Sequence, residues 1–295
     1  MKQEHNFRNI TLNDIHLTNC IISSIRQKPN LPDNMRVLEV GCGSGTFLLY
    51  MIDTLSKTFP EISFDFYAFD VHESELTFKD EELNKSHLFR LHSALKGKYK
   101  NHDWETKIKI LKPSDDWHQQ LEFFDLIISN QVLEHVADKP TFFHKLNKNL
   151  KLSGNSFHLF PTLDVFWEWH IHVPFAHWFK SEKSLRKFII LYKYLTSPIK
   201  FIKNHTQMMD TIDHDAKYIL DKTHYCSTQE FIKYCHTQNL NVNLRYTYPY
   251  YVLKACQWLK IDINRIDFYN CNKLIHYLTF FITKRVSSIT LHISK

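Results

Sequence analysis

The stretch MRVLEVGCGSGTFLLYMIDTL, residues 35–55, joins a short apolar run to a cluster of glycines. Val37–Val40 has the composition of a buried strand, and apolar residues recur at helical intervals from Phe47 to Leu55. Three of the chain's 5 glycines lie between them, where the backbone must turn sharply and can approach a ligand without a Cβ in the way. A strand, a glycine turn and a helix in this order predict the opening unit of a doubly wound α/β domain.

An acidic residue precedes the glycine turn. The turn reads GCGSG at positions 41–45, and Glu39 stands two positions before it. Thr46 occupies the place where the dinucleotide-binding fingerprint G-x-G-x-x-G has its third glycine. The resulting pattern, (D/E)-x-G-x-G-x-G, resembles motif I of the class I S-adenosylmethionine-dependent methyltransferases. The resemblance implies that the cofactor is S-adenosyl-L-methionine and that its contacts include Glu39, Gly41, Cys42, Gly43 and Gly45.

A second acid follows where the ribose of such a cofactor would lie. The stretch ISFDFYAFDVHES (62–74) contains an apolar strand that ends at Asp70, 25 positions beyond Gly45. A carboxylate in that place can accept hydrogen bonds from both ribose hydroxyls. The separation is close to the roughly 20 residues typical of dinucleotide-binding units. Asp70 and the adjoining Val71 are therefore predicted cofactor contacts.

A third strand is expected within TKIKILKPS (106–114). In the family that the chain resembles, an acidic residue after this strand commonly meets the adenine amino group, and an apolar neighbour lies against the ring. Asp115 or Asp116 would serve as the acid, and Trp117 as the apolar neighbour. A polar loop that starts a helix is an equally good interpretation of any single one of them.

The fourth strand brings a second specific match. In FFDLIISNQVLEHVAD (123–138) a buried run ends at Ser129, and the segment resembles the "FDlIis…vLEHv" motif of small-molecule methyltransferases. The resemblance implies that Asn130 and Gln131 line the cofactor. The stretch 146–161 then predicts a helix, a turn at Gly154 and a fifth strand that ends in an apolar run.

The four motifs cover about residues 35–162 and imply a Rossmann-like, doubly wound, seven-stranded and mainly parallel sheet. About 60 residues intervene before a predicted helix over Thr228–Gln238, capped by Ser227 or Thr228, and a strand over Val242–Tyr246. A final strand is expected near the end of the chain. We therefore divide the chain into an N-terminal helical segment (1–34), an S-adenosylmethionine-binding core (35–162), a substrate-binding insertion or helical lid (163–223) and a C-terminal completion of the sheet (224–295).

Two classes of nucleic-acid chemistry are disfavoured by what the motifs lack. Enzymes that methylate exocyclic amines of bases usually carry (D/N/S)-P-P-(Y/F/W) after the fourth strand, but residues 129–132 read SNQV. The chain has no Pro-Cys dipeptide, which cytosine C5 methylation requires. The LEHV type is associated with small molecules, and O-methylation is the commonest reaction. The expected partner is therefore a small-molecule or glycan acceptor.

The insertion opens with WEWHIHVPFAHWF (167–179). A metal site is one interpretation, because Glu168, His170 and His172 would point the same way on an extended segment. No recognised zinc spacing is present, so no metal is predicted. A membrane-facing patch and plain core packing are two further interpretations. The acceptor pocket is favoured, because the stretch follows the fifth strand and offers aromatic walls with a few polar groups.

This favoured interpretation gives the histidines roles. His170 is the preferred general base, His135 is its rival, and an acceptor hydroxyl would lose its proton to one of them. The E-x-H and P-F-x-H-W patterns also resemble a subgroup of methyltransferases linked to cell-surface polysaccharide biosynthesis, and tryptophan faces suit sugar rings. The predicted substrate contacts are Glu168, Trp169, His172, His177 and Trp178.

Composition sets wider limits. The net charge of +6 is compatible with an anionic substrate, a membrane surface or RNA. The 6 cysteines form no C-x-x-C pair, which favours a reducing cytoplasm. No uncharged apolar run reaches the roughly 18 residues of a spanning helix, so contact with the inner face of a membrane would be peripheral. The sequence does not indicate the oligomeric state.

Three alternatives to an O-methyltransferase stay open. A nicotinamide-dependent oxidoreductase is disfavoured by Thr46 and by the LEHV segment. A non-catalytic protein that binds S-adenosylmethionine would show binding without turnover. An RNA methyltransferase would bind RNA with a strong dependence on salt.

Overall fold

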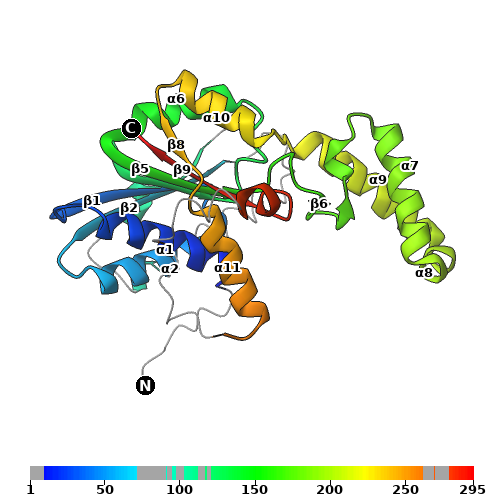
Figure 1. The fold of residues 1–295 in the computed structure, drawn as a ribbon, viewed down its shortest axis with the longest axis horizontal. Helices are drawn as coiled ribbons and strands as arrows, with labels where there is room; N and C mark the ends of the chain where they lie inside the picture. Colours follow the sequence, from blue (N-terminus) through cyan, green and yellow to red (C-terminus); the bar gives the residue numbers. More distant parts are fainter. Residues whose placement is uncertain are drawn as a thin grey trace.

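The computed structural model describes residues 10–71, 91, 95–97, 103–111, 117, 121–261, 269 and 279–295. Asp115 and Asp116, the predicted contacts of the adenine amino group, lie outside these described residues. The central feature is a seven-stranded sheet in the order β3-β2-β1-β4-β5-β9-β8 (Figure 1). Its strands are β1 (Asn34–Val40), β2 (Ser63–Val71), β3 (Ile108–Leu111), β4 (Phe124–Asn130), β5 (Leu150–Phe160), β8 (Asn241–Asn243) and β9 (Ile289–Ser294).

The pairing pattern confirms the predicted fold class. Strands β1 to β5 all run parallel to their neighbours. Strand β9 is antiparallel to both β5 and β8 and lies between them, so β8 is the edge strand on that side. Because the chain order reverses between β1 and β4, the carboxyl ends of these two neighbouring strands open a crevice where ligands bind in such sheets.

Two apolar layers cover the sheet, one on each face. Helices α1 (Leu12–Arg26), α2 (Thr46–Thr58) and α11 (Thr247–Trp258) pack on one face, and α6 (Lys139–Asn149) and α10 (Thr228–Thr237) on the other (Figure 1). Strand residues alternate between the layers, as a period of two requires. Leu126 and Ile128 belong to the first core, whereas Ile127 belongs to the second.

Two helices begin at capping boxes that satisfy their first amide groups. At the start of α10, Ser227 Oγ accepts from the Glu230 N–H, and the Glu230 carboxylate accepts from the Ser227 N–H. Ser227 is thus the cap, of the two residues that the sequence offered. At the start of α1, Thr11 and Asp14 form the same arrangement. This box fixes the orientation of Asp14, whose other carboxylate oxygen faces the end of β4.

Two predicted elements differ from the structure. Gly154 lies inside β5 and not in a turn before it, because the pairing of β4 with β5 shifts register opposite Phe124 and Leu126. The glycine marks this irregularity within one long strand. The strand predicted over Val242–Tyr246 ends at Asn243, whose side-chain Oδ1 accepts from the Arg245 N–H at 2.7 Å and turns the chain into α11.

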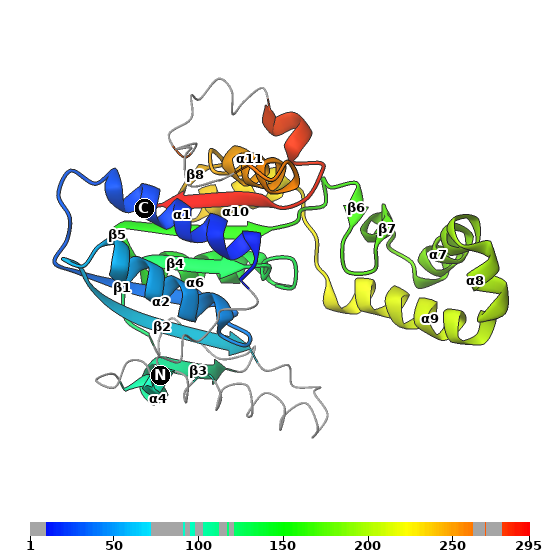
Figure 2. The ribbon, with the colours of Figure 1, turned by 90° about the horizontal axis from the view of Figure 1, so that it is seen from below.

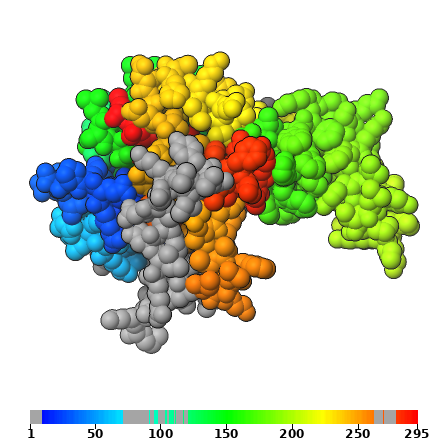
Figure 3. All heavy atoms as spheres, in the orientation of Figure 1, coloured from blue at the N-terminus to red at the C-terminus, as the bar shows by residue number. Residues whose placement is uncertain are grey.

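Residues 163–223 form an arm beside the carboxyl end of β5. Its hairpin pairs β6 (Trp167–Glu168) with β7 (Val173–Pro174), and the short helix η1 (Ala176–Trp178) follows. Helices α7 (Glu182–Thr196), α8 (Pro198–Lys203) and α9 (His205–Lys222) make up the rest. They extend away from the sheet and not over it (Figures 2 and 3). The predicted lid is therefore an arm that does not cover the strands. Its apolar residues are buried in a small core of its own.

Candidate active site

The glycine turn leaves β1 and passes beside the end of β2. The Gly41 and Cys42 N–H groups both donate to the carbonyl of Phe69, at 2.8 and 3.1 Å. Gly41 and Gly45 have positive φ angles of 73° and 74°, which side chains rarely adopt. A Cβ would lie 2.5 Å from Val132 at Gly41 and 2.3 Å from Leu91 at Gly45. Glycine is therefore required at these two positions by both conformation and space.

Three carboxylates surround this turn. Asp70, at the end of β2, accepts a hydrogen bond from the Gly43 N–H. Glu39 is buried in β1, and its Oε2 has no hydrogen-bond partner among the described residues. Burial, followed by the charges of Asp14 and Asp70, raises the pKa of Glu39 well above its usual range. A positively charged ligand would relieve this electrostatic strain.

Asp14 was not among the predicted site residues. It lies on α1, and its Oδ1 accepts from Asn130 Nδ2 at 2.9 Å, which joins the N-terminal helix to the end of β4. The sequence signal was the T-x-x-D capping box, which by itself indicates only a helix start. Asn130, a predicted cofactor contact, is therefore bonded to Asp14, whose charge in turn acts on Glu39.

Other predicted cofactor residues have structural roles in the described protein. Cys42 is buried, and Trp117 packs in the core against Phe69, with ring centroids 5.3 Å apart. Gln131 has a positive φ of 56°, and its Nε2 donates to Ser288 Oγ at 3.1 Å, which ties the loop after β4 to the start of β9. Val71 is the last residue of β2, one position beyond the predicted end of this strand at Asp70.

The second half of the site is the hairpin of the arm. Residues 169–172 form its turn, so His170 and His172 do not alternate along an extended segment as the metal interpretation required. Glu168 is fully buried, and its Oε1 accepts from His170 Nδ1 at 2.6 Å. The other oxygen, Oε2, accepts from the Ile171 N–H at 2.8 Å. His172 is exposed, with a positive φ of 55°, and it stands apart from this pair.

Tyr225 completes the pair, although sequence reasoning missed it. Its hydroxyl donates to Glu168 Oε1 at 2.8 Å and lies 3.1 Å from His170 Nδ1. Burial alone would lower the pKa of His170, but the hydrogen bond and charge of Glu168 and the charge of Glu134 outweigh it, so the pKa is raised. Burial acts to raise the pKa of Glu168, and hydrogen bonds from His170 and Ile171 hold it below its usual value instead.

The two rival base candidates lie side by side. The rings of His135 and His170 are nearly perpendicular, with centroids 5.3 Å apart. Glu134 joins them, and ligand atoms of the three residues all lie within 4.8 Å of one another. Burial raises the pKa of Glu134 to about 8, against the lowering effects of its own amide and of the nearby His170 and Lys139. Glu134 was part of the recognised LEHV motif but was not singled out.

The remaining aromatic residues predicted for the substrate site lie on the same segment, 167–179. Trp169 and Trp178 are each partly exposed, and the Trp178 Nε1–H donates to the carbonyl of Leu163 at 2.9 Å. His177, a predicted substrate contact, is buried under the hairpin, and its Nε2 lies 3.0 Å from the carbonyl of Val165. Its ring packs 4.9 Å from that of Tyr225. The two tryptophans are therefore partly accessible to a ligand, whereas His177 is buried and packs against Tyr225.

Comparisons with solved structures find similar folds at low identity. PKMT2 from Rickettsia typhi is 17% identical, with a TM-score of 0.48, over 97% of this chain and 53% of that one. Phosphoethanolamine N-methyltransferase 2 from Haemonchus contortus, solved with S-adenosyl-L-methionine, is 10% identical, with a TM-score of 0.45, over 93% of this chain and 51% of that one. An O-methyltransferase of a Brevibacillus brevis polyketide synthase, solved with S-adenosyl-L-homocysteine, is 13% identical, with a TM-score of 0.45, over 94% of this chain and 71% of that one.

The chain spans about half the length of the first of these structures. None of the likenesses bears on the acceptor of this chain. A search of curated proteins finds no match. The family model described as a methyltransferase domain matches residues 20–242, which is more than half of the chain and includes both the glycine turn and the hairpin. The protein therefore belongs to the methyltransferase-domain family, as motif I and the LEHV segment indicated.

Proposed function

We propose that the chain transfers a methyl group from S-adenosylmethionine to a hydroxyl oxygen of a small-molecule or glycan acceptor. The observation that carries the proposal is the buried Glu168 paired with His170, beside the segment that follows β4. Val132 belongs to that segment and packs against Gly41 of the glycine turn, so the two halves of the site adjoin. Family membership supports methyl transfer in general, and the choice of oxygen rests on the histidine pair.

The carboxylates around the turn fit this cofactor. S-adenosylmethionine supplies an activated methyl group on a sulfonium, and it also carries an ammonium group. Asp14, Glu39 and Asp70 provide negative charge where such a cation would lie, and the raised pKa of Glu39 shows that charge there lacks compensation. A dinucleotide would need the turn amides for its phosphates, but the Gly43 N–H is already engaged by Asp70.

His170 is positioned to accept the proton of the acceptor hydroxyl. Its Nδ1 is bonded to Glu168, which fixes the tautomer and leaves Nε2 as the accepting atom. The negative charge of Glu168 stabilises the protonated ring, which is why the pKa of His170 is raised toward the range where a general base works best. Tyr225 donates to the same oxygen of Glu168, Oε1, and helps to hold it in place.

We further propose that the arm residues 163–223 bind the acceptor and that the acceptor is a glycan or its precursor. The partly exposed Trp169 and Trp178, on the segment that also carries His170, support this choice, because sugar rings present apolar C–H surfaces to aromatic side chains. A part in polysaccharide biosynthesis is the corresponding proposal for the cellular role.

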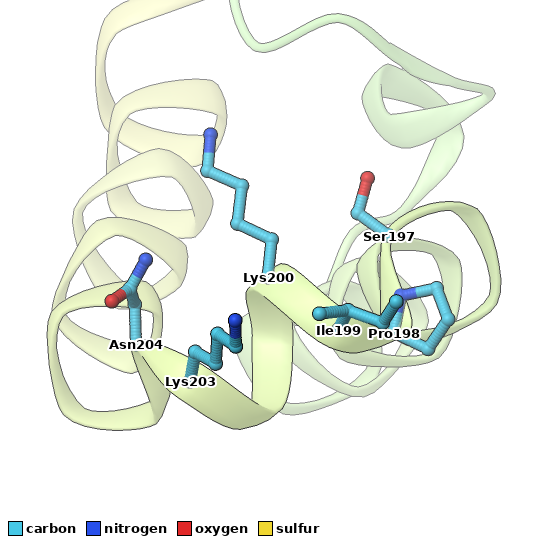
Figure 4. Close-up of a pocket in the computed structure, with 6 residues that line it drawn as sticks. All are labelled: Ser197, Pro198, Ile199, Lys200, Lys203 and Asn204. Carbon is cyan, nitrogen blue, oxygen red and sulfur yellow. The ribbon is translucent and has the colours of Figure 1, made fainter.

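We also propose that the tip of the arm, helix α8 (Pro198–Lys203), makes peripheral contact with a membrane. No helix within the described residues is long and apolar enough to cross a bilayer. On α8, Ile199 and Ile202 are 69% and 67% exposed, and Lys200 and Lys203 project from the same short helix (Figure 4). Apolar side chains flanked by cations suit the headgroup region of an anionic bilayer. The tip would then bring the enzyme to the inner face of a cell membrane from the cytoplasm.

The proposal is tested by a transfer assay with labelled S-adenosylmethionine. Hydroxyl-bearing acceptors would be screened in sets of sugars, nucleotide sugars and lipid precursors, and RNA would be included as a separate class. We expect transfer to one hydroxyl class, and a loss of at least about 100-fold in kcat for His170→Gln. His144→Gln, on the exposed side of α6, is the matched control. Full turnover in the His170 variant would refute the assignment of the base, and cofactor binding without any transfer would favour a binding protein.

A further inference from the structure

We propose that Glu134, His135 and His170 form a binding site for one divalent transition-metal ion. Their ligand atoms lie within 4.8 Å of one another, although they come from two segments, the loop after β4 and the turn of the β6–β7 hairpin. One carboxylate and two imidazoles are a ligand set that binds Zn²⁺, Mn²⁺ or Fe²⁺. Residues 167–179 show no zinc spacing because only one of the three ligands lies in that stretch.

The state of Glu134 is the first independent observation. Its side chain is fully buried, and neither carboxylate oxygen meets the geometry of a hydrogen bond with any described residue. A buried carboxylate without partners is costly, and such groups are normally paired or bound to a metal. An ion between Glu134 and the two rings would satisfy this carboxylate.

The partners of the two rings are the second observation. His170 Nδ1 is bonded to Glu168 Oε1 at 2.6 Å, and His135 Nδ1 lies 2.8 Å from the carbonyl of Lys222. Histidines that bind metals typically donate their other ring nitrogen to a carboxylate or a backbone carbonyl, which fixes the tautomer and the ring orientation. Both rings have the partner that this rule requires, so Nε2 of each would be the ligand atom.

The dimensions allow an ion with little rearrangement. Ligand atoms around a tetrahedral Zn²⁺ lie about 3.4 Å apart, since each bond is about 2.1 Å long. A cluster that spans at most 4.8 Å would contract by roughly 1 Å on binding. The His170 side chain is 24% exposed and sits on a hairpin turn, so this side of the site can both adjust and admit a further ligand. An open fourth position is the feature of catalytic and not of structural sites.

The catalytic consequence rests on the proposed function. An ion held here would lower the pKa of an acceptor hydroxyl that approaches its open side. His170 would take the proton directly only in the metal-free protein, because the ion would occupy its Nε2. The proton of the hydroxyl would then pass to solvent water. Metal binding itself does not depend on this step and is measured separately.

The test is calorimetric titration of the chelator-stripped full chain with Zn²⁺, Mn²⁺ and Mg²⁺. We expect one ion to bind, with Zn²⁺ or Mn²⁺ preferred to Mg²⁺, because imidazole ligands favour the transition metals. Glu134→Gln keeps the size of the side chain but removes its charge, and it should weaken binding at least about 100-fold. Glu168→Gln, which changes the partner of His170 but none of the three proposed ligands, should weaken binding about 10- to 100-fold. His144→Gln should bind as the wild type does.

Folding and function are controlled in the same samples. Each variant is also titrated with S-adenosylhomocysteine, and retained binding shows that the variant is folded. The metal proposal is overturned if the wild type binds none of the three ions, or if Glu134→Gln binds Zn²⁺ and Mn²⁺ as tightly as the wild type. Loss of S-adenosylhomocysteine binding by the wild type would instead overturn the proposed function and leave the metal site standing.

Discussion

His158 lies between two serines in the middle of the sheet, where protonation is strongly opposed. Its Nδ1 is 2.7 Å from Ser129 Oγ, and its Nε2 is 2.6 Å from Ser156 Oγ. Burial lowers the pKa of His158 from 6.5 to about 3. A histidine whose pKa falls on folding contributes stability that is complete above its unfolded pKa and is lost as the pH falls below it. Acid should therefore destabilise the protein through this residue.

The size of the effect follows from these two pKa values. Between pH 8 and pH 5 the unfolded chain gains a proton at this site that the folded chain does not, which costs about 2 kcal/mol of the free energy of unfolding. His16 and His292, each with a pKa lowered to about 3 by burial, act in the same direction. Glu134 acts in the opposite direction. Burial raises its pKa to about 8, so the free-energy cost of burying it as a charged carboxylate decreases as the pH falls and the group is protonated.

The contribution of His158 is isolated by comparing the wild type with His158→Gln. Glutamine does not titrate in this range, so the free energy of unfolding of the wild type should fall relative to that of the variant by about 2 kcal/mol from pH 8 to pH 5. The assay is urea unfolding of metal-free protein at pH 5, 6, 7 and 8. His144→Gln, on the exposed side of α6, is measured alongside as the control substitution. A gap for His158→Gln that is the same at pH 5 and pH 8 would refute the reasoning.

Four further predictions concern the site and the arm. Asp70→Asn replaces an acceptor with a donor toward the ribose, so S-adenosylhomocysteine should bind about 30- to 150-fold more weakly by calorimetry; an unchanged Kd contradicts this. Gly45→Ala should abolish cofactor binding, because its Cβ would lie 2.3 Å from Leu91; wild-type affinity contradicts this. In the metal-free protein, Glu168→Gln should lower kcat and move the acidic limb of the kcat–pH profile to lower pH, because Glu168 holds the pKa of His170 up; a limb at the wild-type pH contradicts this. Ile199→Glu should reduce cosedimentation with anionic vesicles, and equal pelleting with neutral vesicles would argue against the proposed tip.

Local patterns account for what the sequence predicted well. The strand before the glycine turn and the run Leu126–Ile128 are short, apolar and bounded by turn residues, so their burial follows from composition alone. Gly41 and Gly45 take positive φ angles, which is the reason that glycine was expected there. The expectation of a seven-stranded, mainly parallel sheet followed from the family resemblance and not from these patterns.

Contacts between distant segments account for what the sequence could not show. Tyr225 reaches Glu168 across the arm, and Asp14 reaches Asn130 from a helix at the other end of the chain. Neither pairing leaves a periodic or spaced signal. The hairpin turn at 169–172 was also missed, because its pairing is only two residues long and contains no Asn-Gly or Asp-Gly signal. The convergence of Glu134, His135 and His170 depends on that turn.

The central claim is that the glycine turn and its carboxylates bind S-adenosylmethionine. Calorimetric titration of the purified chain with S-adenosylmethionine, S-adenosylhomocysteine and NAD tests it most directly, with Asp70→Ala measured alongside. The account predicts that the first two ligands bind, that NAD does not, and that the variant loses both, because Asp70 orders the turn through the Gly43 N–H. Binding of NAD, or failure of both sulfur ligands to bind the wild type, would contradict the account.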